Sequence, residues 1–184
     1  MGGTILVFGD SLSAGYGLPQ DRSWVSLLEK RVREEAPNYT VANASLSGET
    51  TAGGATRIAG ALKAHQPDIV VIELGANDGL RGQNLDVMRR NLEAMIDASR
   101  NAKAQVLLVG MRLPPNYGTA YTEKFRQTFA DLARTRKLAY VPFLFDGFAE
   151  ESRYFQPDRV HPTSEAQALM LDTVWKGLKP LLKR

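Results

Sequence analysis

Three side chains at opposite ends of the chain have the types and spacing that nucleophilic catalysis needs. Ser11 directly follows the first apolar run, and Asp158 stands three residues before His161 near the other end. At this spacing a short loop can turn the carboxylate onto the imidazole Nδ1–H, which fixes the tautomer and leaves Nε2 as a base. A neutral imidazole base needs a nucleophile, and the Ser11 hydroxyl is the best candidate. The pattern therefore predicts acyl transfer.

Hydrogen-bond donors for the oxyanion of such a reaction are also present. Each donor of this kind typically contributes about 2.7–4 kcal/mol to transition-state stabilisation. Gly48 can bring a bare backbone N–H close to a substrate, because nothing projects from its Cα, and Asn77 offers a side-chain NH₂. Taken singly, each residue is typical of a turn. Together with Ser11 and His161, they supply every part of an acyl-transfer site.

The elements that must position these side chains alternate along the chain. Continuous apolar runs, typical of strands covered on both faces of a parallel sheet, occur at 4–8, 39–44, 69–74, 106–109 and 139–143. Apolar residues at helical spacing predict helices around 24–32 (with Ser23 as N-cap), 58–62, 85–96, 125–132 and 171–182. This order predicts an α/β fold of three layers (α/β/α), flavodoxin-like, with a five-stranded parallel sheet in the order 2-1-3-4-5. Without a linker or repeat, residues 1–184 are expected to form a single domain.

In an open parallel sheet the active crevice lies beyond the carboxyl ends of the strands. Every candidate residue above lies in a loop that follows a strand, so all are expected at one edge of the sheet. His65 instead precedes the third strand, which predicts a helix-end or surface role at the opposite edge. Ser13, Ser45 and Ser47 are expected to be helix N-caps.

The composition narrows the chemistry. The chain has 184 residues, no cysteine and two histidines. This excludes disulfides and cysteine nucleophiles, and disfavours a metal site made of histidines alone. The phosphate-binding Gly-x-x-x-x-Gly-Lys-Ser/Thr, the dinucleotide-binding Gly-x-Gly-x-x-Gly and the Gly-x-Ser-x-Gly nucleophile elbow are absent. We therefore expect no metal and no other cofactor.

Charge and hydropathy indicate which partners to expect. The net charge is +3, and the basic residues at 30–33 are interspersed with Glu29, Glu34 and Glu35. This pattern is typical of a solvated helix face, so no nucleic-acid partner is expected. No apolar stretch approaches the ~20 residues that span a bilayer, and no leader-like segment precedes the first run. We expect no stable membrane anchor.

Four motifs in this chain resemble the blocks of the SGNH (GDSL) hydrolases: Gly9-Asp10-Ser11-Leu12, Gly48, Gly75-Ala76-Asn77-Asp78 and Asp158-x-x-His161-Pro162. They occur in the family's order and span nearly the whole chain, and the segments 80–82 and 110–118 are similar to the bacterial thioesterase I / lysophospholipase / arylesterase branch. The resemblance implies that Ser11 is the nucleophile, His161 the general base and Asp158 its orienting carboxylate. It also implies an oxyanion hole made by the backbone N–H groups of Ser11 and Gly48 with the Asn77 side chain.

For the substrate, the resemblance implies carboxylic esters and thioesters, such as aryl esters, acyl-CoA and lysophospholipids, hydrolysed through an acyl-enzyme. The loop matching 79–84 moves over the acyl group in that branch, and the segment matching 113–114 lines the chain-binding groove. We expect an open leaving-group side and an apolar acyl side, built from Leu80, Met111, Leu113, Pro114 and Tyr117. Ordinary loop packing is the alternative for these residues, and it is the expectation for Phe143 and Phe145.

Two other functions stay open. One is a carbohydrate O-deacetylase of the same superfamily, and the other is a non-catalytic flavodoxin-like binding module. We expect a monomer whose partners are small-molecule acyl esters or thioesters. The resemblance implies a periplasmic or secreted protein with a cleaved signal peptide, and a cytoplasmic protein is the alternative.

Overall fold

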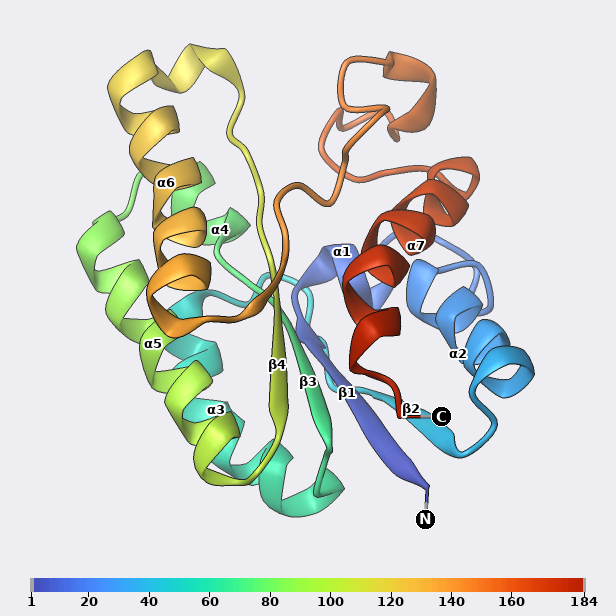
Figure 1. The fold of residues 1–184 in the computed structure, drawn as a ribbon. Helices are drawn as coiled ribbons and strands as arrows, with labels where there is room; N and C mark the ends of the chain where they lie inside the picture. The colour runs from blue at the N-terminus through green and yellow to red at the C-terminus, as the bar shows by residue number, and fades with distance from the viewer. Residues whose placement is uncertain (1, 184) are drawn as a thin grey trace.

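A parallel sheet of five strands forms the centre of the computed structural model, which describes residues 2–183 (Figure 1). Met1 and Arg184, the ends of the predicted domain, lie outside that range. The strands are β1 (Gly3–Gly9), β2 (Tyr39–Asn43), β3 (Ile69–Glu73), β4 (Gln105–Val109) and β5 (Ala139–Val141). Their order is β2-β1-β3-β4-β5, so the predicted topology is confirmed. β1 lies inside the sheet, paired with β2 and β3.

Helices cover both faces of the sheet, as predicted. They are α1 (Ser11–Ala14), α2 (Trp24–Glu35), α3 (Thr51–His65), α4 (Ala76–Leu80), α5 (Leu85–Asn101), α6 (Thr119–Arg136) and α7 (Ser164–Leu178). Short 3-10 turns, η1 (Pro115–Tyr117), η2 (Ser152–Tyr154) and η3 (Lys179–Leu181), complete the chain. α2 and α7 pack together on one face, and α3, α5 and α6 form the layer on the other. No helix of residues 2–183 is both long and apolar enough to cross a membrane.

Local sequence explains where the main elements begin and end. Ser23 caps α2 as predicted, because its side chain accepts a hydrogen bond from the Ser26 N–H. β3 is buried at every position, which is typical of an inner strand of a parallel sheet. β5 is two residues shorter than predicted. Pro142 follows it and has no N–H with which to continue the ladder.

Two short helices were not predicted from the sequence. α1 begins at Ser11 and α4 at Ala76, directly after the strand ends of β1 and β3. Four or five residues are too few to show a helical period, so sequence patterns miss such elements. Both helices start within the motifs that resemble catalytic blocks, and they set the direction of the side chains there.

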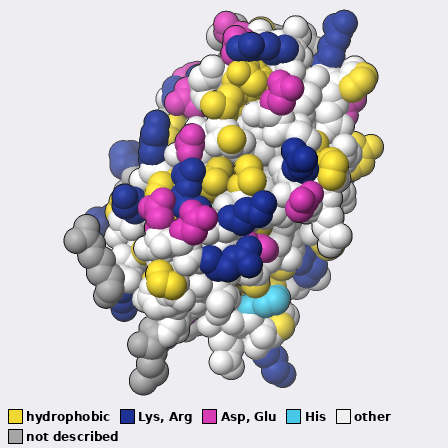
Figure 2. Space-filling view, turned by 90° about the vertical axis from the view of Figure 1, so that its right-hand side faces the viewer, with side chains coloured by type: hydrophobic (Ala, Val, Ile, Leu, Met, Phe, Trp, Pro, Cys, Tyr) yellow, Lys and Arg dark blue, Asp and Glu magenta, His cyan; other side chains and the backbone are white. Residues whose placement is uncertain are grey.

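The face that carries α2 and α7 has basic and acidic side chains side by side (Figure 2). Arg31 on α2, for example, donates to Asp172 on α7 at 2.9 Å. This is the mixed, solvated surface that the sequence predicts for the first long helix.

Candidate active site

Ser11, Asp158 and His161 meet at the carboxyl edge of the sheet. The Ser11 Oγ lies 2.9 Å from His161 Nε2, although the two residues are 150 positions apart. On the other side of the ring, His161 Nδ1 lies 2.6 Å from Asp158 Oδ2. The imidazole is thus held with one nitrogen on a carboxylate and the other on a hydroxyl. This is the arrangement that a base acting on Ser11 requires.

The Asp158 carboxylate is held ionised by the loop that carries it. Its Oδ1 accepts hydrogen bonds from the backbone N–H groups of Val160 at 2.9 Å and His161 at 3.0 Å. Partial burial acts to raise the pKa of Asp158. The two N–H donors and the His161 ring outweigh it and lower that pKa to about 2. A full negative charge therefore faces the imidazole throughout the neutral range.

The loop itself is a tight turn before α7. The backbone N–H of Gln156 donates to the carbonyl of His161 at 2.7 Å, and Phe155 pairs with Pro162 in an antiparallel bridge. Arg159 adopts the left-handed backbone conformation, with φ of 62°, and reverses the chain between Asp158 and His161. The turn brings both side chains back toward the end of β1.

The predicted oxyanion donors are linked through Glu49. The Asn77 Nδ2 donates one hydrogen bond to the Glu49 carbonyl at 3.0 Å, which fixes the amide and leaves its second N–H for another acceptor. Gly48 precedes Glu49 with φ of 82°, a backbone conformation that favours glycine. Nothing lies within 4 Å of where a Gly48 side chain would begin. Asn77 lines the cavity that contains Ser11, and Gly48 lies outside the set of lining residues.

The buried Asp78 on α4 binds Thr51, the first residue of α3, and so connects the segments that follow β2 and β3. Its Oδ1 accepts from the Thr51 N–H at 2.8 Å, and its Oδ2 accepts from the Thr51 hydroxyl at 2.6 Å. Asn91 on α5 donates to that hydroxyl at 3.1 Å. These bonds hold the segments of Gly48 and Asn77 in a fixed relation. Sequence reasoning noted Asp78 in a motif and assigned it no role.

A buried acid pair beneath the nucleophile was missed at the sequence level. Asp10 precedes Ser11 and caps α1 by accepting from the Leu12 N–H at 2.9 Å. Glu73, the last residue of β3, accepts from the Ser13 hydroxyl at 2.6 Å. Burial raises the pKa of Asp10 to about 6, although the Leu12 N–H offsets part of this effect. Burial, with the nearby Asp10 charge, raises the pKa of Glu73 well above its usual range. Asp10 Oδ2 and Glu73 Oε2 are both buried without a hydrogen-bond partner among residues 2–183, so ionising both carboxyl groups at once is unfavourable.

The predictions for the neighbouring serines were wrong. α1 is capped by Asp10 and α3 by Thr50, so none of Ser13, Ser45 and Ser47 caps these helices. The buried Ser13 hydroxyl contacts Glu73 instead, and the Ser45 Oγ accepts from the Gly9 N–H at 3.0 Å. A serine that follows a strand can hydrogen bond to another loop or strand instead of to a helix N-terminus, and Ser13 and Ser45 do so here. His65 is the exposed last residue of α3, as predicted.

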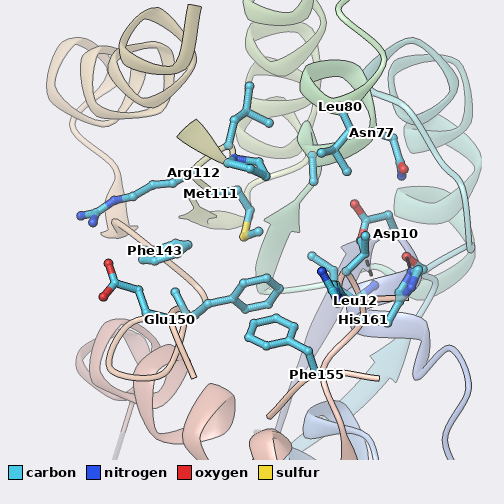
Figure 3. Close-up of a pocket in the computed structure, with 18 of the residues that line it drawn as sticks. Asp10, Leu12, Asn77, Leu80, Met111, Arg112, Phe143, Glu150, Phe155 and His161 are labelled. Carbon is cyan, nitrogen blue, oxygen red and sulfur yellow. Dashed lines mark hydrogen bonds between the residues drawn. The ribbon is translucent and has the colours of Figure 1, made fainter. Parts of the chain in front are cut away.

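An apolar cavity of about 490 Å³ opens beside Ser11, Asn77 and His161. Four of the predicted groove residues line it: Leu80, Met111, Leu113 and Pro114. Phe143 and Phe145, which were expected only to pack in a loop, are buried and also line the cavity. Phe155 lines it as well, and Figure 3 shows Phe143 and Phe155 among the lining side chains. The aromatic wall comes from the segment between β5 and α7, which has no periodic pattern that could have indicated it.

Tyr117 does not line the cavity. Its hydroxyl donates to the Leu80 carbonyl at 2.7 Å, and the Tyr121 hydroxyl donates to the Gln83 carbonyl at 3.0 Å. Both tyrosines therefore hydrogen bond to the backbone of the 79–84 loop. The predicted movement of that loop stays a prediction.

Within residues 2–183, no three His, Cys, Asp or Glu side chains are grouped so that they could hold a metal ion. The polar groups that converge at the carboxyl edge are those of the Ser11–His161–Asp158 chain, the Asn77 amide and the acid pair below them.

Comparison with known proteins identifies the family. A model of the GDSL-like lipase/acylhydrolase family matches residues 7–169. Esterase TesA of Pseudomonas aeruginosa is 46% identical over 179 residues, which cover 97% of this chain and 89% of the relative. Thioesterase 1/protease 1/lysophospholipase L1 of Escherichia coli K12 is 37% identical over 179 residues, covering 97% and 85%. A crystal structure of TesA matches with a TM-score of 0.94 at 46% identity, covering 97% of this chain and 99% of that one. The chain belongs to the GDSL-like lipase/acylhydrolase family, as its four motifs predicted.

Proposed function

We propose that the protein is a serine ester hydrolase that cleaves carboxylic esters and thioesters through an acyl-enzyme. The observation that carries this proposal is the 2.9 Å contact between Ser11 Oγ and His161 Nε2 at the mouth of an apolar cavity. A hydroxyl on an oriented imidazole is an activated nucleophile. Its position beside a cavity defines where an acyl group would lie.

In the first step, the Ser11 Oγ bonds to the substrate carbonyl carbon while its proton passes to His161 Nε2. The carbonyl oxygen becomes an oxyanion, which is stabilised by the backbone N–H groups of Ser11 and Gly48 and by the Asn77 amide. The bond from carbon to the leaving oxygen or sulfur then breaks, and His161 returns the proton to the leaving atom. Asp158 supports the imidazolium that exists between these two transfers.

In the second step, a water molecule replaces the leaving group. His161 takes a proton from this water as the water oxygen bonds to the acyl carbon. The bond to Ser11 Oγ breaks, Ser11 regains its proton from His161, and the carboxylic acid leaves. These two steps use only side chains and backbone groups of the protein and one water molecule.

The cavity supports a fatty acyl chain as the acyl portion. Its wall is mainly aliphatic and aromatic, although Arg112, Glu150 and Arg159 also line it, and about 490 Å³ is within the range of small-molecule sites. An acetyl group would leave most of that wall empty, so the cavity favours longer esters over acetylated sugars. A series of p-nitrophenyl esters with acyl chains of about 2 to 16 carbons tests this preference for longer chains. Equal kcat/KM along the series would remove the case for an acyl groove.

The decisive experiment changes the nucleophile. Ser11→Ala is expected to lower kcat by several orders of magnitude and to abolish labelling by a fluorophosphonate probe, with the fold unchanged by circular dichroism. Ser152→Ala, at an exposed serine of η2, serves as the matched control and is expected to keep both activity and labelling. Near-normal turnover by Ser11→Ala would refute the mechanism. Absence of both turnover and labelling in the unaltered protein would favour a binding module.

We further propose that the protein works as an exported, periplasmic monomer. Its resemblance to an exported branch of the family supports this. Cell fractionation with the full-length gene product and light scattering of the purified protein are the tests. Recovery in the cytoplasm, or a dimer in solution, would contradict the corresponding part of the proposal.

A further inference from the structure

An aromatic ring covers one face of the His161 imidazole. The Tyr16 and His161 ring centroids are 4.3 Å apart with an angle of 39° between the planes. Tyr16 is 51% exposed, so much of its own surface is free. It is not among the residues that line the acyl cavity, whereas His161 is. The Tyr16 ring therefore offers aromatic surface next to the base and outside the cavity.

The Tyr16 backbone is fixed to both the nucleophile and the base. Its N–H donates to the Ser11 carbonyl at 3.2 Å, and its carbonyl accepts from the Gln156 Nε2 at 3.0 Å. The backbone N–H of Gln156 in turn donates to the His161 carbonyl. Gly17, with φ of 72°, lets the Gln156 side chain approach, since a Cβ there would lie 2.3 Å from Gln156 Oε1. The ring is thus carried by a segment bonded to both sides of the site.

Tyr16 is part of a small apolar rim. The three most exposed large apolar side chains of residues 2–183 are Tyr16, Leu46 at 49% and Val160 at 42%. The Leu46 backbone N–H donates to the carbonyl of Gly9, two residues before Ser11, at 3.0 Å. Val160 directly precedes His161 and also lines the acyl cavity, so it lies where the rim meets that cavity. Exposed apolar side chains beside a proposed catalytic group can contribute to a binding surface. We call these three residues the rim.

The proposed mechanism defines what lies at the rim. The leaving atom of any substrate must reach His161 Nε2, because that nitrogen returns the proton. The acyl chain occupies the cavity, so the alcohol portion extends from the same point outside it. We infer that the rim is a leaving-group subsite and that Tyr16 favours esters whose alcohol portion carries an aromatic ring. This inference rests on the proposed function and adds a specificity-determining residue to it.

The test compares two esters that share an acyl group and differ in the alcohol. Benzyl hexanoate and propyl hexanoate both release primary alcohols, and only the first can place a ring on Tyr16. Tyr16→Ala is expected to lower kcat/KM for the benzyl ester about threefold to tenfold more than for the propyl ester, the usual range for an aromatic pair. Tyr16→Phe is expected to keep the benzyl preference. An equal loss for both esters in Tyr16→Ala would overturn the inference and leave Tyr16 as a residue that only positions His161.

Two more variants make the result specific. Leu113→Ala, in the acyl cavity, is expected to change the dependence on acyl-chain length and to leave the benzyl-to-propyl ratio as it was. Tyr16→Leu keeps apolar volume without the ring, so it repeats the test if Tyr16→Ala does not fold. It too is expected to lose the benzyl preference, and retention of that preference would overturn the inference. If the unaltered protein cleaves neither ester and takes no fluorophosphonate, the proposed function itself has failed.

Discussion

Asp158 and Asp10 flank the same Ser11–His161 contact in opposite electrostatic environments. The Asp158 side chain is 39% exposed, accepts two backbone N–H bonds, and has its pKa lowered to about 2. Asp10 is 1% exposed, faces Glu73, and has its pKa raised to about 6. One residue type therefore has its charged form stabilised on one side of the contact and disfavoured on the other.

The difference separates the groups that act on His161 from the groups that support Ser11. A charge near solvent can respond to an imidazolium without a large desolvation cost, because water screens it when the ring is neutral. Two neighbouring buried carboxyl groups are disfavoured when both are ionised, because burial and the like charge both act against the charged form. We therefore expect changes at Asp158 to affect turnover, and changes at the buried pair to affect stability and its dependence on pH.

The largest effect is expected on turnover from Asp158→Asn. The amide has nearly the same shape and cannot stabilise the imidazolium, so kcat is expected to fall about 100-fold to 10,000-fold. Steady-state kinetics on a p-nitrophenyl ester measure this, with the melting temperature as a check on folding. A loss of less than about tenfold would mean that Asp158 only shapes the loop.

The next effect is on stability, from Glu73→Ala. This change empties buried volume beside Gly9 and leaves the buried Ser13 hydroxyl without its acceptor. The free energy of unfolding in urea is expected to fall by about 2–4 kcal/mol. Asp158 is the more exposed of the two aspartates, so Asp158→Ala is expected to lower the free energy of unfolding by less than about 1 kcal/mol. Equal costs would remove the distinction between the two regions.

The smallest effect is on how stability varies with pH, from Glu73→Gln. The unfolded chain releases the Glu73 proton near 4.5, whereas the folded chain keeps it to higher pH. The folded state thus binds more protons, and the free energy of unfolding falls as pH rises from 4.5 toward the raised pKa. Glutamine removes this decline. Asp10 contributes with the same sign between 3.8 and about 6, so the comparison is made above that range.

Urea unfolding of the unaltered protein and of Glu73→Gln at about pH 6.5 and pH 8 measures how the free energy of unfolding changes with pH. Glu73→Gln is expected to show the smaller change. Asp158 acts with the opposite sign, because its contribution is present above 3.8 and is lost as pH falls toward about 2. Identical slopes for the two proteins above pH 6.5 (approximately) would show that Glu73 is already ionised there.

The topology and the three-residue chain Ser11–His161–Asp158 could be predicted from the sequence. The continuous apolar runs predicted the strands and therefore the carboxyl edge of the sheet. The loops at that edge include His161 and exclude His65. Glu73 also left a signal, since it is a single acid at the end of an apolar run and must be either buried with a partner or excluded from the strand. The partner, Ser13, is 60 positions away, so no local pattern could name it.

Other features depend on contacts that have no period. The aromatic wall of Phe143, Phe145 and Phe155 arises from an irregular segment whose path is decided by packing against the rest of the cavity. Tyr16 follows a four-residue helix, and its contact with His161 exists only because the turn before α7 folds back over β1. Such pairings of distant loops require the tertiary structure.

The 150 positions between Ser11 and His161 also bear on when the protein becomes active. The nucleophile is made first, and its base is made only after all five strands. On the proposed mechanism, a chain still emerging from the ribosome, or cut short before Asp158, has a serine without a base. Such a chain therefore lacks the group that activates the serine. The proposed activity therefore requires the turn before α7 to meet the end of the first strand.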